Sequence, residues 1–288
     1  VFYFVYRNAD QTDKIHAAIE KLASGETSYK VDVNDFSSLE AELAEGLNRI
    51  SDGLETALAE QVKSERLKAD LITNVSHDIK TPLTSIINYV DLIKRQHIED
   101  PTVQKYLEVL DQKSQRLKTL TEDLVEASRA SSGNIKLEIT NIDFVELVQQ
   151  TTGEFEEKYA IRHLEIVNTL PNEVIMIEAD GRRLWRVLEN LYNNAFKYAL
   201  EGTRVYVTIE DHGADVMFTI KNVSANPLNI SPDELTERFV RGDVSRTTEG
   251  SGLGLSIAKD LTTLQGGKFE LIIDGDLFKA QITFPIKN

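Results

Sequence analysis

The first quarter of the chain carries apolar residues at the spacing of amphipathic helices. One such stretch covers residues 13–24 and stops at Gly25, and a longer one runs from about residue 37, past Gly53, towards residue 68. A short extended piece with the sequence YKVDV lies between them. Apolar positions that recur every three or four residues predict helices, and glycine is a common helix stop. The pattern therefore predicts two helices joined by an extended connector.

Two further helices show the spacing of a heptad seam. The first has its seam positions at Ile72, Val75, Ile79, Pro82, Ile86, Tyr89 and Ile93. After a loop near residues 95–102, the second has them at Val103, Tyr106, Leu110, Lys113, Leu117, Leu120 and Leu124. Residues at alternating steps of three and four form one strip along a helix. The two strips predict a helical hairpin, and this much apolar surface predicts pairing with a second copy into a dimeric four-helix bundle.

Beyond residues 130–134, a hinge rich in serine, the pattern changes to that of an α/β domain. Strand-like segments read KLEIT, RVYVTIE, VMFTIKN, KFELIID and AQITFP, with helices between them. The sequence DHGAD separates two of these segments and is interpreted as a hairpin turn. A helix that starts at Asp180 has an apolar stripe suited to covering a sheet, made of Leu184, Val187, Leu188, Leu191 and Ala195. The fold class is therefore α+β and multidomain.

Composition narrows the classes of function. A chain of 288 residues corresponds to about two domains. Its 32 basic and 47 acidic residues give a net charge of -15, which argues against nucleic acid as a partner, because phosphate-backbone contacts need clustered Lys and Arg. The absence of cysteine excludes a disulfide framework and thiolate metal sites.

The N-terminus opens with six apolar or aromatic residues followed by Arg7. This run is far shorter than the ~20 apolar residues that span a bilayer. We interpret it as the end of a severed membrane helix with a cytoplasmic-side arginine. An ordinary frayed strand or helix is the alternative.

His77 is the first candidate for chemistry. The heptad frame puts it at position f, which points away from the seam, and Thr81 shares its face one turn later. An exposed imidazole can attack a phosphoryl group when an acceptor, here the adjacent Asp78, holds its other nitrogen as N–H. Pro82 removes a helix hydrogen bond and is expected to bend the segment. The remaining histidines are interpreted as ordinary surface residues: His16, His97, His163 and His212.

A second candidate cluster lies in the sequence ENLYNNAFKYA. Along this helix Asn190, Asn194 and Lys197 fall on one polar stripe beside the apolar stripe. Amide oxygens suit Mg²⁺, a hard cation, and a lysine suits phosphate oxygens. On spacing alone, a solvated polar face is the alternative.

A third candidate is the glycine-rich sequence EGSGLGLSIAKDL. Gly250, Gly252 and Gly254 stand just before a predicted helix. Glycines let a backbone approach a phosphate, and a helix N-terminus offers free N–H groups. Taken alone, a glycine-rich loop is a weak signal.

The sequence SHDIKTPL resembles the H-box of sensor histidine kinases of two-component systems, of the HisKA type. The resemblance implies that His77 is the phosphoacceptor, that Asp78 assists as a base, and that Thr81 positions water for dephosphorylation of the partner. An ATPase of another kind within the same superfamily would not need the sequence SHDIKTPL, so this sequence favours a kinase.

The C-terminal half resembles the GHKL (Bergerat) ATP-binding fold, because the asparagine helix is followed about 60 residues later by the glycine loop. LTERFVRGD resembles the F-box of that family, with a nucleotide lid over residues 242–249, and KNVSANP stands at the adenine box with Asn222 in place of the usual Asp and Ser224 in place of the first Gly. The resemblance implies Mg²⁺ and ATP as cofactors, with Asn194 as metal ligand. The nucleotide-binding residues that it implies are Asn190, Asn194, Lys197, Tyr198, Asn222, Phe239, Arg241, Gly250, Gly252, Leu253 and Gly254.

These resemblances imply a domain order. Residues 1–7 would end a transmembrane helix, residues 8–62 resemble a HAMP signal-relay module that lacks the usual proline in its first helix, residues 63–131 would dimerise and carry the phosphoacceptor, and residues 132–288 would bind ATP. The expected protein is the cytoplasmic portion of a membrane-bound, homodimeric kinase that phosphorylates His77 and passes the phosphoryl group to the receiver domain of a response regulator. The altered adenine box leaves a pseudokinase or scaffold of the same fold as the alternative.

Overall fold

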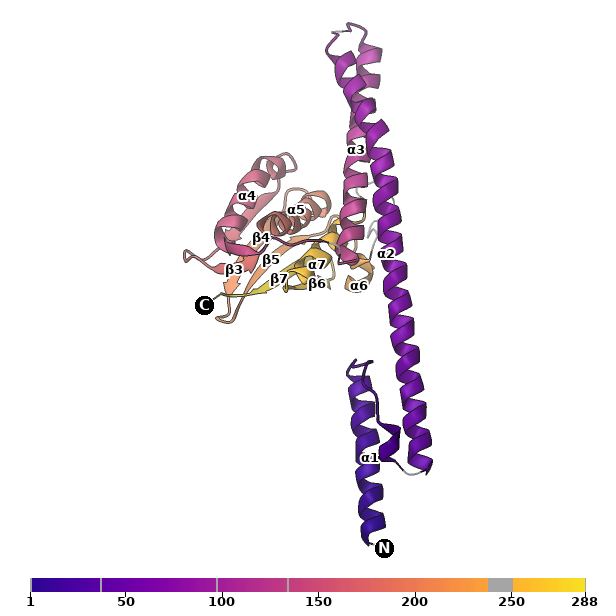
Figure 1. Ribbon diagram of the computed structural model, residues 1–288. Coiled ribbons are helices and arrows are strands. Elements are labelled where there is room, and N and C mark those ends of the chain that lie inside the picture. The colour runs from indigo at the N-terminus through magenta and orange to yellow at the C-terminus, as the bar shows by residue number, and fades with distance from the viewer. Residues whose placement is uncertain (1, 37, 97, 134, 238–250, 288) are drawn as a thin grey trace. The chain divides into compact units, whose positions relative to one another are not determined.

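The computed structural model describes residues 2–36, 38–96, 98–133, 135–237 and 251–287 (Figure 1). The chain divides into two compact units, Val1–Lys68 and Ala69–Asn288. Each unit is described by itself.

The first unit has the two helices and the connector that the sequence predicts. Helix α1 (Phe2–Ala23) is followed by a connector with the short 3-10 helix η1 (Val33–Asp35) and by the start of α2 (Ser38–Lys94). The side chain of Asn48 ties the connector to α2, since it accepts from the Val31 N–H and donates to the Val31 carbonyl, both at 2.9 Å. A small core surrounds this contact and contains Ala18, Val31, Phe36 and Ala44. Within the described residues, no helix has the length and apolarity to cross a membrane.

The second unit begins with the predicted helical hairpin. Helix α2 passes through Pro82 and ends at Lys94, and α3 (Pro101–Ser131) follows a short loop. The Asp100 side chain caps α3 by accepting from the Thr102 N–H at 2.8 Å. Near the tip of the hairpin, Lys94 and Asp111 form an ion pair at 2.7 Å between the two helices. The predicted hairpin and its loop are confirmed.

Within one chain, the predicted seam is not the surface by which α2 packs against α3. Large apolar side chains at eight of its positions are exposed: Val75, Ile79, Ile86, Tyr89, Ile93, Tyr106, Leu110 and Leu117. The buried positions recur instead at intervals of seven on a neighbouring strip, as Ala69, Ser76, Leu83 and Val90 on α2 and Leu107, Ser114, Thr121 and Ser128 on α3. Several of these residues are small or polar, so the spacing of large apolar residues does not reveal them. Small side chains nevertheless suit this position, because they let two helices approach closely.

The α/β domain packs three helices on one face of a five-stranded sheet (Figure 1). The sheet order is β2 (Glu165–Thr169), β4 (Arg204–Asp211), β5 (Asp215–Val223), β7 (Leu277–Pro285) and β6 (Lys268–Asp274), with only β2 and β4 parallel. The covering helices are α4 (Phe144–Ala160), α5 (Gly181–Tyr198) and α7 (Gly254–Leu264). Smaller elements are α6 (Pro232–Thr236) and the antiparallel pair β1 (Thr140–Asp143) and β3 (Met176–Ala179). The predicted two-layer α/β sandwich is confirmed.

Most of the predicted strands and the apolar stripe are also confirmed. The five stripe residues of α5 are all buried against the sheet. DHGAD forms the turn between β4 and β5, where Gly213 has a φ of +81° and donates to the Asp211 carboxylate at 2.7 Å. The prediction for KLEIT is wrong, because only its last residue, Thr140, belongs to a strand. Within this segment the Glu138 N–H donates to the Asp180 carboxylate at 2.9 Å, so a side chain takes the place of a strand partner there.

Helix α5 is fixed at both ends. Asp180 caps its N-terminus by accepting from the Arg183 N–H at 3.1 Å. At its C-terminus the Arg162 guanidinium donates to the carbonyls of Lys197 at 2.9 Å and Ala199 at 3.1 Å. Midway along, the Tyr159 hydroxyl of α4 donates to the Tyr192 carbonyl at 2.7 Å. These contacts hold the polar stripe of α5 in one position above the sheet.

Candidate nucleotide and phosphoacceptor site

A cavity of about 360 Å³ lies beside the polar stripe of α5. Its volume is in the range of small-molecule sites. It brings together residues from α5, from β5 and from the start of α7, as the sequence predicted. The predicted residues among its lining are Asn190, Asn194, Lys197, Tyr198, Asn222, Gly252 and Gly254, and Leu253 lies buried between the two glycines.

Asn222 presents an unused hydrogen-bond acceptor in this cavity. Its side chain is buried, and its amide nitrogen donates to the Val223 carbonyl at 3.2 Å. Its oxygen Oδ1 is buried without a partner in the described part of the chain. A buried acceptor without a partner costs about 1–3 kcal/mol, so a ligand that donates a hydrogen bond here is favoured. The exocyclic amine of adenine is such a donor.

The glycine loop meets α5 closely. Gly252 has a φ of +71°, in the left-handed region that favours glycine. A Cβ at Gly254 would stand 3.3 Å from Oδ1 of Asn190, so a side chain there would crowd the cavity. The amide nitrogen Nδ2 of Asn190 is buried and, among the described residues, has no partner. Helix α7 starts at Gly254, so the loop adds free backbone N–H groups at a helix N-terminus, which suits an anion.

Several residues of the cavity were not predicted from the sequence, among them two on α4 and α5 that contact each other and two more on α5. Lys158 of α4 and Asn193 of α5 both line it, although Asn193 lies about 100° around the helix from Asn194. Lys158 Nζ donates to Asn193 Oδ1 at 2.6 Å. Arg186 and Glu189 also line it. Arg186 stands four residues before Asn190 and so shares its face of α5, which could have identified the arginine from the sequence. Nothing in the local pattern identifies Lys158.

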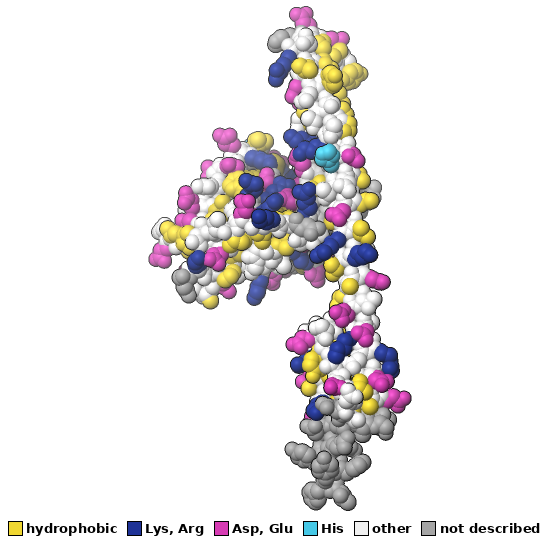
Figure 2. Space-filling view, viewed as in Figure 1, with side chains coloured by type: hydrophobic (Ala, Val, Ile, Leu, Met, Phe, Trp, Pro, Cys, Tyr) yellow, Lys and Arg dark blue, Asp and Glu magenta, His cyan; other side chains and the backbone are white. Residues whose placement is uncertain are grey.

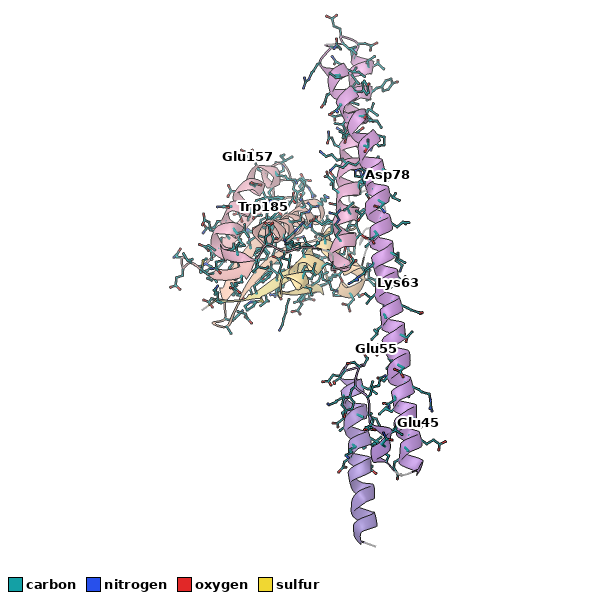
Figure 3. The ribbon with its side chains drawn as sticks, in the orientation of Figure 1. Glu45, Glu55, Lys63, Asp78, Glu157 and Trp185 are labelled. Atoms are coloured by element: carbon teal, nitrogen blue, oxygen red, sulfur yellow. The ribbon has the colours of Figure 1, made fainter. Side chains whose placement is uncertain are left out.

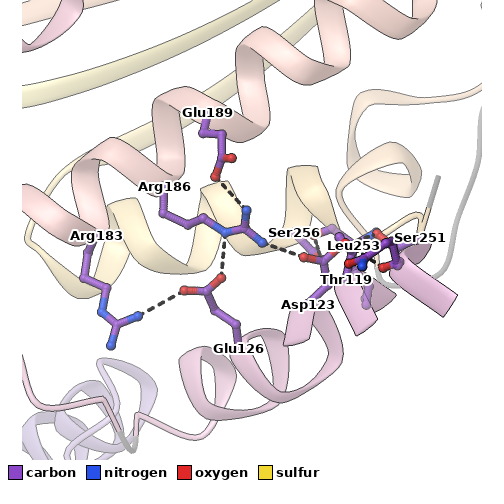
Figure 4. Close-up of polar contacts among 10 residues, drawn as sticks. Thr119, Asp123, Glu126, Arg183, Arg186, Glu189, Ser251, Leu253 and Ser256 are labelled. Atoms are coloured by element: carbon purple, nitrogen blue, oxygen red, sulfur yellow. Dashed lines mark hydrogen bonds and ion pairs between the residues drawn. The ribbon is translucent and has the colours of Figure 1, made fainter. Parts of the chain in front are cut away.

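An ion-pair cluster joins α3 to α5 beside the cavity (Figure 4). The guanidinium of Arg186 contacts three carboxylates, those of Asp123 at 2.5 Å, Glu126 at 2.8 Å and Glu189 at 2.7 Å. Arg183 binds the second oxygen of Glu126 at 3.0 Å. All five side chains are at most about one-third exposed. Removal of one partner from such a cluster leaves an uncompensated charge, so the cluster holds the α/β domain against α3.

The same cluster reaches the glycine loop. The hydroxyl of Ser251 donates to the second oxygen of Asp123 at 3.0 Å and accepts from the Leu253 N–H at 3.2 Å. Asp123 and Thr119 of α3 also line the cavity. Residues of α3 therefore complete the cavity beside α5, a contact that the sequence did not predict.

His77 stands out from α2 as the heptad frame predicted. Its side chain is 80% exposed, and Nδ1 lies 3.6 Å from Oδ1 of Asp78; Asp78 is on the segment of α2 that runs alongside α3 (Figure 3). The Thr81 hydroxyl donates to the His77 carbonyl at 3.4 Å, one turn along the same face. The exposed ring with a carboxylate beside one nitrogen has the arrangement that a phosphoacceptor needs.

A second cavity, of about 410 Å³, includes His77. Basic side chains from both helices and from α5 surround it: Lys80, Lys118, Arg129 and Arg183. Lys and Arg side chains gather on the face where α3 meets the α/β domain (Figure 2). Glu126 lines this second cavity, while Asp123 and Arg186 line the first, so the ion-pair cluster stands between the histidine and the first cavity.

Three predicted residues, Phe239, Arg241 and Gly250, and the lid over residues 242–249 lie outside the described residues.

Comparison with known families agrees with this arrangement. Residues 67–133 match the His Kinase A (phospho-acceptor) domain, and residues 179–287 match the histidine kinase-, DNA gyrase B- and HSP90-like ATPase family. The chain is 28% identical over 237 residues to the sensor histidine kinase WalK of Bacillus subtilis, which covers 80% of this chain and 39% of that protein. It is 31% identical over 229 residues to the sensor protein VanS of Enterococcus faecium, which covers 77% of this chain and 58% of that protein.

Solved structures show the same fold. Full-length ShkA in complex with AMPPNP matches with a TM-score of 0.65 and 23% identity, over 76% of this chain and 46% of that one. The histidine kinase ThkA in complex with the response regulator protein TrrA matches with a TM-score of 0.55 and 23% identity, over 81% of this chain and 67% of that one.

The two matched families make up a phospho-acceptor hairpin followed by a histidine kinase-type ATPase domain. The chain belongs to the sensor histidine kinases of two-component systems. It spans roughly two fifths to three fifths of the length of the curated relatives named above.

Proposed function

We propose that this protein binds Mg²⁺ and ATP, phosphorylates itself on His77 and passes the phosphoryl group to an aspartate of a response regulator. The observation that carries the proposal is the exposed His77–Asp78 pair in the same unit as a cavity with an unpartnered buried acceptor at Asn222. The complexes named for the two solved relatives, with AMPPNP and with a response regulator, support the same classes of ligand and partner.

The first chemical step uses the imidazole of His77 as nucleophile. Asp78 faces Nδ1 at 3.6 Å, so it can hold the proton on that nitrogen and leave Nε2 as the attacking atom. A bond forms between Nε2 and the γ-phosphorus while the bond from the γ-phosphorus to the β,γ-bridging oxygen breaks. ADP leaves with that electron pair, and the Nδ1 proton passes to Asp78 or to water. The products are phosphohistidine and ADP.

Asn194 is the proposed metal ligand. Its amide oxygen is of the hard type that Mg²⁺ prefers, and it lines the cavity between Asn190 and Lys197. When bound, Mg²⁺ would neutralise charge on the phosphates during transfer. Within the described residues no group of three His, Cys, Asp or Glu side chains forms a metal site, which fits a cation held by one amide oxygen together with phosphate and water.

The second chain of a homodimer is the proposed cover for the exposed strip of the hairpin. Eight large apolar side chains on α2 and α3 remain exposed there. Burial of apolar surface stabilises association by ~25 cal/mol per Å². We further propose that residues 8–62 act as a HAMP-like relay, that residues 63–131 and 132–288 are the phosphoacceptor and ATP-binding domains, and that the chain is the cytoplasmic part of a membrane sensor.

Thr81→Ala is expected to spare autophosphorylation and to slow dephosphorylation of the regulator about a hundredfold, the lower end of the range for groups that assist proton transfer. The reason is the position of the hydroxyl one turn from His77 on the exposed face. The measurement is the decay of aspartyl phosphate on a receiver domain that the wild type phosphorylates. Thr56→Ala is the matched control, because Thr56 is also exposed on α2, bonds a backbone carbonyl at 2.8 Å and does not line the cavity that includes His77. Equal decay with the wild type and the Thr81 variant would remove the threonine from the mechanism.

Asn222→Ala is expected to weaken ATP binding about tenfold, because the adenine amine would lose its buried acceptor. GTP binding should change less, since guanine carries an acceptor at that edge. Calorimetric titration of both nucleotides measures the difference. If the alanine variant binds ATP as the wild type does, Asn222 is not at the base and the scaffold alternative gains support.

Incubation with Mg²⁺ and ATP labelled at the γ-phosphate tests the whole proposal. Phosphohistidine is stable in alkali and labile in acid, so the label should survive only the alkaline quench. A protein that binds ATP and acquires no label would be a pseudokinase of this fold.

A further inference from the structure

Lys158 is a half-buried cation that the proposed chemistry does not yet use. It lies near the end of α4, two residues before that helix ends at Ala160, and it lines the nucleotide cavity. Its ammonium lies 5.1 Å from the ring centroid of Phe155 and 4.9 Å from that of Phe196. Contacts of this kind hold a cation by the electrostatic attraction of the ring face. Two aromatic rings therefore fix where the ammonium sits.

The hydrogen-bond partner of Lys158 is neutral. Nζ donates to Asn193 Oδ1 at 2.6 Å, and among the described residues it forms no ion pair with a carboxylate. Most half-buried cations are paired with an anion, since burial without one is costly. An ammonium in a cavity wall with only an amide oxygen and two rings as partners can accept an anionic ligand.

A second cation adds to the positive charge of the same wall. Lys197 also lines the cavity. Burial lowers the pKa of Lys158 below the usual lysine value, and the nearby charge of Lys197 lowers it further. Glu189 partly opposes both effects. Two ammonium groups that repel each other are both stabilised when a polyanion binds between them or beside them.

We propose that Lys158 binds the polyphosphate of the nucleotide, together with Lys197, and so sets the preference of the cavity for charged nucleotides. This assignment rests on the proposed ATP-binding function and adds a residue from α4, outside the asparagine helix and the glycine loop. Asn193 of α5 then acts as a positioning residue, since its amide oxygen accepts a hydrogen bond from the ammonium and holds it in place.

The test compares ligands that differ only in phosphate. Adenosine, ADP and ATP are titrated calorimetrically into the wild type and into Lys158→Met and Lys158→Gln, which keep an unbranched side chain to pack on the two rings. ATP affinity is expected to fall about tenfold in both variants, because a charge-assisted contact to phosphate is lost. Adenosine affinity is expected to change less than twofold, and Lys158→Arg is expected to restore part of the ATP affinity.

Lys221→Met is the matched control. Lys221 lies on β5 with its ammonium 5.3 Å from the ring centroid of Tyr206, and it is not among the described residues that line the cavity. Its variant is expected to bind all three ligands as the wild type does.

Two results would overturn the assignment of Lys158. Equal losses for adenosine and ATP would mean that the lysine only supports α5 through Asn193, and unchanged ATP affinity would mean that its charge does not reach the phosphates. Failure of the wild type to bind adenosine and ATP would instead overturn the proposed nucleotide function itself.

Discussion

His77→Ala is expected to abolish autophosphorylation while ATP affinity stays within about twofold of the wild type, a difference of under ~0.5 kcal/mol. The side chain is 80% exposed, so its removal costs little packing, and it is not part of the nucleotide cavity. Without the imidazole, α2 loses the exposed nitrogen that lies beside the Asp78 carboxylate. Labelling with γ-labelled ATP and an alkaline quench measures the loss, and calorimetry measures binding.

His212→Ala is the matched control for this substitution. His212 is also exposed, and its Nε2 lies 3.9 Å from the carboxylate of Glu210, so it shares the chemistry of an exposed histidine with an acidic neighbour. The His212→Ala protein should be labelled as fully as the wild type. Acid-stable label that persists in the His77 variant would show that a hydroxyl group is the acceptor.

Asn194→Ala is expected to reduce autophosphorylation by at least about a hundredfold, equivalent to ~2.7 kcal/mol. Mg²⁺ would lose its oxygen ligand from α5, and the neighbouring Asn193 cannot replace it, because its oxygen already accepts from Lys158 at 2.6 Å. ATP affinity in the presence of Mg²⁺ should fall as well. The measurement is ATP binding with Mg²⁺ and with a chelator, together with the rate of labelling.

The chelator separates a metal role from a packing role. Wild type and Asn194→Ala should bind ATP equally once Mg²⁺ is removed. Asn168→Ala, at an exposed position of β2, is the control and should match the wild type in both conditions. An Asn194 defect of the same size with and without Mg²⁺ would mean that the side chain shapes the cavity and does not bind the metal.

Local patterns predicted most of the elements and the exposed faces of His77 and of the polar stripe of α5. The position of His77 followed from heptad counting, because the f position of a helix is exposed whatever the helix packs against. The polar stripe of α5 followed in the same way, since its apolar stripe fixes which side meets the sheet. Asn222 was recognised by resemblance, and the structure adds that its oxygen is buried and has no hydrogen-bond partner among the residues described.

Contacts between elements far apart in sequence could not be predicted. Arg186 binds Asp123 of α3, 63 residues away, and Lys158 meets Asn193, 35 residues away. No period along either helix encodes such a meeting, because it depends on how α3, α4 and α5 pack. The strip by which α2 packs on α3 was missed for a related reason: it contains Ser76 and Ser114, which are small and polar, while the predicted strip of large apolar residues stays exposed in one chain.

The central claim is that the γ-phosphoryl group of ATP is transferred to His77. Mass spectrometry of the wild type after incubation with Mg²⁺ and ATP, with digestion and peptide separation kept alkaline, locates the phosphate directly. We expect one phosphorylated site, on the peptide that contains His77, and none when a non-hydrolysable ATP analogue replaces ATP. Phosphate on another residue, or its absence from His77 in protein that binds ATP, would contradict it.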